Sequence, residues 1–506
     1  MHPSPHSTTD FGTKLTYGFG AVAQGAKANG FSYLLLFFYS QVIGLPADAV
    51  SFALFIALVF DAVSDPAVGY LSDNLRSRWG RRHPFMYASA IPVSIGYYFL
   101  WSPPAWSETA LVAYLTVMAI LIRTTVTFYD IPATALVAEL TEDYDERTKF
   151  VSFRYFFAWW GGLTMAVLAY LVFLPEERGG LLYVEGWANY GLAASIIMFL
   201  SIMVSSLGTH RHIPYLKQPP PRPPGEEGFD LRRALRELGE TLGNRSFLVL
   251  FVAALFTAVA SGVSTTLSIY FTRHMWEFTT AQIGYLQFPY FFSAFLALFV
   301  APLATRTLGK KTAGITITTI AVVMAPMPYI LRMVGWFPEN GTDVLFWTIL
   351  AFNGLEVTLI ICSSILVAAM IADVVEDSEV TTGRRSEGTF FAANTFAQKA
   401  VNGLGVIVAG QILAFVQFPT QAGLGEVPME TVYDLTRIYI PVEWGFYLVA
   451  IVMLGFYRIS RDGHEQNLTR LTEARAARLA AETTDPGELG PAGPGGLHPA
   501  GARPPA

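Results

Sequence analysis

The amino-acid sequence predicts an all-α membrane protein with twelve transmembrane helices in two six-helix bundles. Of its 506 residues, 53% are hydrophobic and 14% are charged, whereas soluble domains carry about 25% charged residues. The hydrophobic residues lie in long runs, and a helix that crosses a bilayer needs roughly 20 of them. The longest polar break inside the chain, at 208–245, divides these runs into six and six.

The twelve predicted spans are the apolar runs between polar breaks. They are residues 15–43, 50–72, 85–102, 109–137, 150–174, 188–207, 247–272, 281–304, 312–333, 343–371, 388–417 and 438–459. We therefore predict a polar N-terminus at 1–14, one bundle at 15–207, a central loop at 208–245, a second bundle at 246–460 and a tail at 461–506. The tail is polar and then rich in Ala, Gly and Pro, which is typical of disordered segments.

Lysine and arginine residues gather in alternate breaks, and this alternation predicts the orientation. The breaks on one side carry Lys14, Arg76, Arg78, Arg81, Arg82, Arg147, Lys149, Arg306, Lys310, Lys311, Arg384 and Arg385. The breaks on the other side carry Arg178, Arg273, Arg332 and Arg437. Because basic loops stay in the cytoplasm, we expect both termini and the central loop to be cytoplasmic, in a plasma membrane and most simply in a bacterial inner membrane.

Two aspartates one helical turn apart interrupt the apolar run of the second span. Residues i and i+4 share a helix face, so Asp61 and Asp65 point the same way, with Ser64 beside them. A carboxylate at membrane depth costs about 3 kcal/mol or more, and such residues usually line ion or substrate paths. This face predicts a site for Na⁺ or H⁺, with the two aspartates as metal ligands if the ion is Na⁺. The alternative, that Asp65 only caps or bends the helix beside Pro66, leaves Asp61 unexplained.

The fourth span carries Arg123, Thr127 and Asp130 on one face over two helical turns. One interpretation is a structural pair of Arg123 with Asp130 within this helix. Another is a polar wall of a central cavity. The two interpretations are compatible, since a paired arginine and aspartate can also line a cavity.

Three further spans carry polar side chains. Gln24 and Lys27 lie one turn apart in the first span, and Gln398 and Lys399 belong to a polar stripe of the eleventh. A buried ammonium requires a carboxylate partner, and the three aspartates named above are the candidates for Lys399. A lysine that exchanges partners between conformations would link ion binding to movement. In the tenth span, Glu356 lies nearer the outer side, where water can solvate it.

The loops after the second, fourth and tenth spans combine basic and acidic residues on one side of the membrane. Positive charge is explained by orientation, but acidic residues contribute little to orientation. We therefore expect these residues to form ion pairs between the bundles that close and open an inner gate. The predicted gating residues are Arg78, Arg81, Glu142, Arg147, Asp373, Glu376 and Arg385.

The sequence offers no catalytic constellation. None of its eight histidines lies in the middle of a span, and its single cysteine, Cys362, lies inside an apolar run. No Gly-rich phosphate loop precedes a helix, and no nucleophile elbow occurs. We therefore expect neither an enzyme nor an ATP-driven pump, and no cofactor other than a coupling ion.

Together these motifs resemble the major facilitator superfamily and, within it, the glycoside–pentoside–hexuronide:cation symporters, to which the melibiose permease belongs. The resemblance covers nearly all of residues 11–460. The motifs that carry it are Tyr17-Gly18-Phe19-Gly20, Asp61 to Pro66 with Arg76 to Gly80, Asp130-Ile131-Pro132 with Glu146-Arg147-Thr148, Ala372-Asp373 with Arg385-Ser386-Glu387, and Lys399. They are specific for the family and much less so for the substrate.

The resemblance implies roles for several of these residues. The acids at Asp61 and Asp65 match the cation ligands of the family, but Ser64 stands where the family has an Asn, which leaves Na⁺ or H⁺ open. Asp130 matches an aspartate that binds sugar hydroxyls. The second sugar-binding acid of the melibiose permease falls at Gly25 here, a departure that argues against the same galactoside specificity. With Lys27 one turn along, the exchange of an acid for a base suggests an anionic or differently shaped substrate, such as a hexuronide.

The expected function is cation-coupled symport of a glycoside, pentoside or hexuronide by alternating access. An alternative is sodium-coupled symport of a lysophospholipid or another amphiphile, and a sensor that has lost transport is much less favoured. The expected partners are a small sugar or sugar acid, a monovalent cation and the bilayer, with no nucleic acid, and the chain is expected to act as a monomer. The expected substrate contacts are Gln24, Lys27, Arg123, Asp130, Gln398 and Lys399.

Overall fold

The computed structural model describes residues 10–141, 143–216, 245–382 and 403–456. Every regular element in these ranges is a helix. The predicted tail, most of the central loop and residues 383–402 lie outside the described residues. The all-α prediction is thus confirmed for the part of the chain that the structure describes.

The first predicted span is not one regular helix. It consists of α1 (Phe11–Phe19), α2 (Ala21–Asn29), η1 (Gly30–Leu34), α3 (Leu35–Phe37) and η2 (Phe38–Val42). The segments η1 and η2 are π-helical, a geometry that occurs mostly as single turns and often at functional sites. The predicted span at 15–43 is thus helical, but its hydrogen-bond register changes along its length, which the apolar composition of the run does not indicate.

The elements that follow in the first half correspond to predicted spans two to six. They are α4 (Ala47–Asn74), α5 (His83–Leu100), α6 (Glu108–Leu140), α7 (Tyr144–Leu168), η3 (Ala169–Phe173), η4 (Glu176–Arg178), η5 (Gly180–Leu182), α8 (Val184–His210) and η6 (Ile213–Tyr215). The elements of the second half are α10 (Arg245–Tyr270), η7 (Phe271–Met275), α11 (Thr280–Tyr285), α12 (Phe288–Leu308), α13 (Lys310–Met324), α14 (Met327–Met333), α15 (Asp343–Thr382), the helix Gly403–Phe415 and α17 (Met429–Gly455).

Nine of the described helices are long and apolar enough to cross a membrane. They occupy the positions of predicted spans two, four to ten and twelve. The remaining three positions are held by the segmented first span, by α5 and by the shorter apolar helix Gly403–Phe415. Described helices thus lie at each of the twelve predicted positions, and at the eleventh only the part from Gly403 onward is described.

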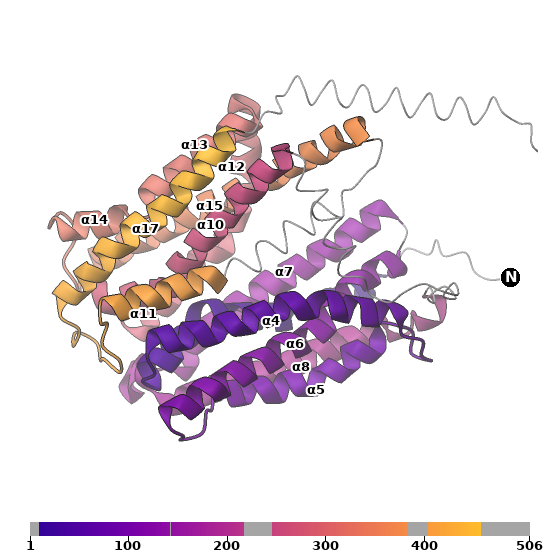
Figure 1. Cartoon of the computed structure of the whole chain (residues 1–506), viewed down its shortest axis with the longest axis horizontal. Coiled ribbons are helices and arrows are strands. Elements are labelled where there is room, and N and C mark those ends of the chain that lie inside the picture. Colours follow the sequence, from indigo (N-terminus) through magenta and orange to yellow (C-terminus); the bar gives the residue numbers. More distant parts are fainter. Residues whose placement is uncertain (1–9, 142, 217–244, 383–402, 457–506) are drawn as a thin grey trace, which may run out of the picture.

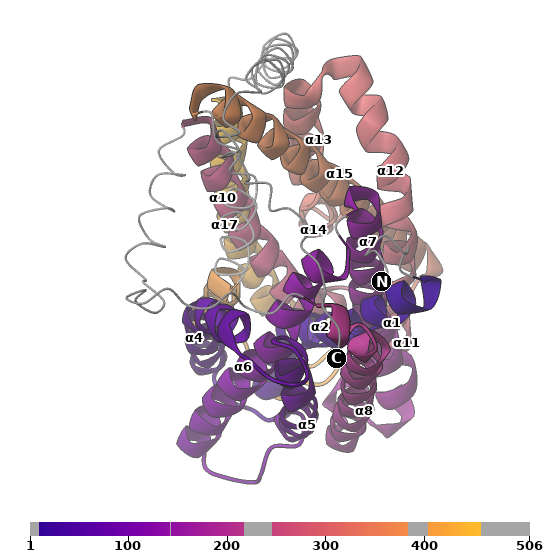
Figure 2. The ribbon, with the colours of Figure 1, turned by 90° about the vertical axis from the view of Figure 1, so that its right-hand side faces the viewer.

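The helices form two groups, one from each half of the chain (Figures 1 and 2). In the first group α4 packs on α6, α5 packs on α6 and α8, and α2 packs on α7. In the second group α10 packs on α17, while α12 and α13 pack on α15. The exact division at 208–245 stays a prediction, since 217–244 lie outside the described residues.

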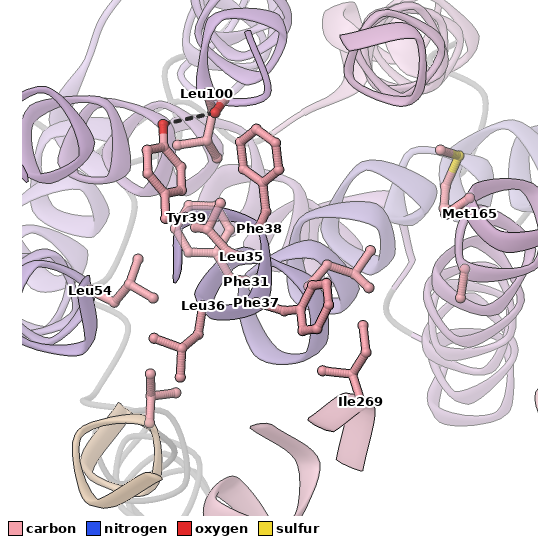
Figure 3. Packing of buried hydrophobic residues seen from close by; sticks show 14 of the residues in the cluster. Phe31, Leu35, Leu36, Phe37, Phe38, Tyr39, Leu54, Leu100, Met165 and Ile269 are labelled. Carbon is pink, nitrogen blue, oxygen red and sulfur yellow. Dashed lines mark hydrogen bonds between the residues drawn. The ribbon is translucent and has the colours of Figure 1, made fainter. Parts of the chain in front are cut away.

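The first span lies at the junction of the two groups. Its turns η1 and α3 contact α10, and the rings of Phe37 and Tyr270 meet edge to face at 5.4 Å. Figure 3 shows its buried side chains pointing in several directions, with Tyr39 donating a hydrogen bond to the carbonyl oxygen of Leu100 at 2.9 Å. The same segment thus packs on both halves.

The two ends of the molecule differ in how the groups are joined. We call the end that holds Lys14, Arg81 and Arg147 the basic end, and the other the opposite end. At the opposite end Gln41 donates to the carbonyl oxygen of Pro419 at 3.0 Å, and Arg273 pairs with Glu176 at 3.1 Å. The hydrogen bonds between described residues that join the groups all involve residues 32–43, 176, 266–280 and 419–421.

Candidate ion and substrate site

Asp61 lies at the centre of a charged cluster between α2, α4 and α6. The residue is 6% exposed. Arg123 on α6 donates from Nη1 to Asp61 Oδ2 at 2.9 Å, and Lys27 Nζ on α2 lies 3.9 Å from the same oxygen. A carboxylate this deep in a membrane protein needs such partners, because an uncompensated buried charge is strongly destabilising. The cluster therefore holds one acid between two basic side chains.

Thr127 joins the two aspartates of α4. Its Oγ1 lies 3.1 Å from Asp61 Oδ1 and 2.8 Å from Asp65 Oδ1, which confirms that the two acids share a helix face. A threonine hydroxyl has one proton to donate, so it can donate to only one of the two carboxylates at a time. The other contact is favourable only if that carboxyl carries a proton. Ser64 does not contact the two carboxylates in this way, because its hydroxyl donates to the backbone oxygen of Asp61 at 3.1 Å.

The structure contradicts one of the two interpretations of the fourth span, the pairing of Arg123 with Asp130. Arg123 pairs with Asp61 on α4, and Asp130 pairs with Arg154 on α7. The one-face prediction for α6 is right, but the face meets two different neighbouring helices. As a result, Arg123 and Lys27 lie at the predicted cation acids, while Asp130 belongs to a second charged centre.

Arg154 is the residue that sequence analysis missed. It follows the start of the fifth predicted span by four residues, a position typical of an arginine at the membrane surface. Instead its side chain is 14% exposed, and its Nη1 is buried without a hydrogen-bond partner among the described residues. The sequence feature that could have indicated Arg154 was Asp130, because a buried carboxylate requires a basic partner somewhere in the fold. The free Nη1 gives this centre an unused donor.

Gly25 occupies the position at which the melibiose permease has its second sugar-binding acid. Gly25 packs directly against α7, and a Cβ added to it would overlap the carbonyl oxygen of Ala158 and lie 2.8 Å from Gly162 N. No side chain, acidic or otherwise, fits at this position. Gln24 has a buried Oε1 without a partner among the described residues, so it offers a polar atom beside this contact.

Several predicted residues fall outside what the structure describes. Gln398, Lys399, Glu142 and Arg385 lie in undescribed segments. Asp373 and Glu376 lie on α15, in a stretch whose side chains are not described. Their predicted roles remain predictions.

The predicted gating residues that the structure does describe gather at the basic end. Arg81 pairs with Glu139 at 2.7 Å, and Arg82 pairs with both Glu139 and Asp73. These contacts tie the ends of α4 and α6 to the loop between α4 and α5, so this network lies within the first group. Arg78 lies over the ring of Trp79 at 5.6 Å, and Arg147 is exposed.

We expect Glu139→Gln to destabilise the basic end. The Glu139 side chain is 4% exposed and faces two arginines, and removing one partner of a buried ion pair costs about 3 kcal/mol or more. Thermal unfolding in detergent measures the change. Glu108→Gln, an exposed acid at the start of the same helix, is the control. Equal midpoints for the two variants would contradict the prediction.

A family model described as MFS/sugar transport protein matches residues 16–461. The chain belongs to this family. It is accordingly a multi-pass membrane transporter of the major facilitator type and not an enzyme, which confirms the resemblance stated above.

Similar bacterial proteins cover almost the whole chain. The putative glycoside/cation symporter YagG of Escherichia coli is 24% identical, over 92% of this chain and 95% of its own length. The isoprimeverose transporter of Lactiplantibacillus pentosus is 22% identical, over 88% of each. A putative sulfoquinovose importer of Escherichia coli is 22% identical, over 93% of this chain and 95% of its own length.

Solved structures share the fold at low sequence identity. A bacterial homologue of the iron transporter ferroportin, in an inward-facing state, superposes with a TM-score of 0.57 at 12% identity. The superposition covers 88% of this chain and 98% of that one. At this identity the likeness concerns the fold alone.

Proposed function

We propose that this protein is a cation-coupled symporter of a glycoside, pentoside or hexuronide that works by alternating access. The observation that carries the proposal is the cluster in which Thr127 joins Asp61 to Asp65, while Arg123 and Lys27 hold the same Asp61. Acids inside a membrane are costly to bury, and where they occur they usually mark an ion or substrate path. The names of the relatives, as glycoside and sugar transporters, support the substrate class.

In the proposed cycle the coupling cation and the two basic side chains compete for Asp61. Without the cation, Arg123 and Lys27 neutralise this carboxylate. A Na⁺ ion between Asp61 and Asp65, or a proton on the pair, makes one basic side chain redundant and releases it. The released side chain is then available to an anionic group of the substrate. This exchange makes cation binding favour substrate binding, which is the coupling that symport requires.

The second charged centre is the proposed substrate contact. Asp130 accepts from Arg154, and Arg154 keeps one buried donor without a partner among the described residues. A sugar hydroxyl can accept from that donor and donate to the carboxylate. The bases Lys27, Arg123 and Arg154 favour a substrate with a carboxylate or sulfonate, in line with the name of the sulfoquinovose importer.

We also propose that the basic end is cytoplasmic and that the described conformation opens toward it. The hydrogen bonds that join the two groups of helices through described residues lie at the opposite end. A transporter whose halves meet at the outer end gives the substrate site access to the inner side. This orientation agrees with the distribution of basic residues in the loops.

The contact at Glu176 makes this closure testable by pH. Burial alone raises the pKa of Glu176, but hydrogen bonds from Thr280 and the charge of Arg273 outweigh burial and hold the pKa below its ordinary value of 4.5. A lowered pKa means that the contact is complete above pH 4.5 and is lost as the pH falls through the lowered value. We therefore expect closure to be constant between about pH 6 and 8.

Glu176→Gln should weaken the closure at neutral pH, because it removes the charge that faces Arg273. A cysteine at Ser268, which lines the cavity between the groups, reports access from outside the cell in a Cys362→Ala background. An impermeant thiol reagent should label it faster in Glu176→Gln than in the control Glu177→Gln, whose side chain is exposed. Equal labelling rates would show that the ion pair does not hold this end closed.

Counterflow in proteoliposomes tests the function itself. Labelled glycosides, pentosides, hexuronides and a lysophospholipid are compared, with the Na⁺ and proton gradients varied independently. Accumulation of a sugar or uronide that follows one cation would establish the symporter and name both ligands. Flux of lysophospholipid alone would move the protein to the amphiphile class. Flux that ignores both cations would refute the coupling.

A further inference from the structure

A second pair of carboxylates lies inside the second group of helices, away from Asp61 and Asp65. Glu443 on α17 is 1% exposed, and its Oε2 is buried without a hydrogen-bond partner among the described residues. Glu356 on α15 is close enough to act on it electrostatically. Glu356 is half-buried rather than fully solvated, and it faces a second acid.

Among the described residues, the titratable groups that face these two acids are tyrosines. Next to Glu443, Tyr439 donates a hydrogen bond to Ser264 Oγ at 3.1 Å. The titratable side chains on the surrounding elements that interact with one or both acids are Tyr33, Tyr290, Tyr329, Tyr439 and Tyr447. None of these described neighbours is basic, so they offer hydroxyl groups and aromatic surface but no positive charge.

Glu356 also lines two cavities. One cavity, of about 70 Å³, lies between the two groups of helices and is lined by Asn29, Gln287 and Asn353 among others. The other, of about 260 Å³, lies within the second group and is lined by hydroxyls such as Thr257 and Thr318. Glu356 lines both. Glu356 therefore lies beside both cavities and interacts electrostatically with Glu443.

The chemistry of the pair selects its ligand. Two neighbouring carboxylates in an apolar region cannot both be ionised at reasonable cost, so at least one holds a proton. A metal ion needs several oxygen ligands around it, whereas a proton needs a single oxygen. A buried carboxyl oxygen without a partner is thus suited to a proton.

We propose that Glu443 and Glu356 form a proton-binding site in the second half of the transporter, separate from the cation site at Asp61. The proton comes from water in the cavity between the halves, binds first to a carboxylate oxygen of Glu356 and passes to Glu443. It leaves by the same route when the cavity opens to the other side. This proposal rests on the proposed transport function and adds a proton to each transport cycle.

Infrared spectroscopy tests the site without any transport. At neutral pH the purified protein should show the C=O stretching band of a protonated carboxylic acid, and Glu443→Gln should remove intensity from it. Glu430→Gln, which changes an exposed acid on the same helix, should leave the band unchanged. A spectrum of the native protein with no protonated-carboxyl band would overturn the proposal. It would also indicate that a base in an undescribed segment, such as Lys399, keeps the pair ionised.

Transport measurements then separate proton coupling from substrate binding. Glu443→Gln and Glu356→Gln should keep substrate counterflow and lose proton-driven accumulation by about tenfold or more, a size usual for coupling between two sites. Glu430→Gln should behave as the native protein. If either variant is poorly folded, the other and the infrared band of the native protein decide. An unchanged ratio of protons to substrate in a folded Glu443→Gln variant would refute the proposal. Absence of all flux in the native protein would instead refute the transport function.

Discussion

Asp61→Asn should abolish cation-driven accumulation of the substrate. The asparagine keeps the size of the side chain but removes the charge that Arg123 and Lys27 now share at Asp61 Oδ2. Without that charge the coupling cation loses the carboxylate for which it competes with the two bases, and Asp65 alone remains. We expect accumulation driven by Na⁺ or by a proton gradient to fall by about tenfold or more, the usual order of coupling between two sites.

The variant also leaves two buried positive charges with less compensation, which can lower stability by about 3 kcal/mol or more. The double variant Asp61→Asn with Arg123→Gln removes one of these charges and should recover much of that stability without recovering accumulation. Asp48→Asn, at the first turn of the same helix, is the control for a neutralised acid on α4. Normal cation-dependent accumulation in Asp61→Asn would refute the assigned role.

Gly25→Ala should strongly destabilise the first half of the protein. The added Cβ would overlap the carbonyl oxygen of Ala158 on α7, and Gly162 on the same helix is also in contact. Both obstacles are backbone atoms, so no rotation of a side chain relieves the overlap and the two helices must move apart. Overpacking of this kind costs about 1–3 kcal/mol and occasionally more, and the larger value is expected at a contact between two backbones.

The midpoint of thermal unfolding in detergent measures this effect. Gly445→Ala provides a matched control, because it lies inside α17 and an added Cβ there meets nothing within 4 Å. The control should be neutral or stabilise the protein by up to about 1 kcal/mol through helix propensity. Gly25→Asp should be at least as damaging as Gly25→Ala, which would show that the acid of the melibiose permease cannot be restored here. A Gly25→Ala variant as stable as the control would contradict the packing argument.

The sequence placed the membrane-spanning elements well. Apolar runs predicted all twelve positions, because burial in lipid demands a minimum length of apolar helix whatever the tertiary arrangement. The i, i+4 spacing also predicted correctly that Asp61 and Asp65 share a face, and both contact Thr127. These features depend on the local geometry of one helix.

The partners of those faces were not predictable in the same way. Arg123 and Asp130 share a face of α6, yet one pairs with α4 and the other with Arg154 on α7. Helical periodicity says which residues point together, but not which neighbouring helix they meet. For the same reason the burial of Glu443 was missed, since an acid within an apolar run gives no sign of whether water, lipid or another helix lies beside it.

The sequence by itself thus determined the fold class, the transporter family and the helix face that carries the candidate cation acids. These follow from composition, periodicity and motifs, which are properties of short stretches of chain. Only the tertiary structure decided that Arg123 and Lys27 meet at Asp61, that Arg154 serves Asp130 and that Glu443 is buried near Glu356. Charge pairing across helices depends on distances of a few ångströms between segments far apart in the chain, and the packing of the helices alone sets those distances.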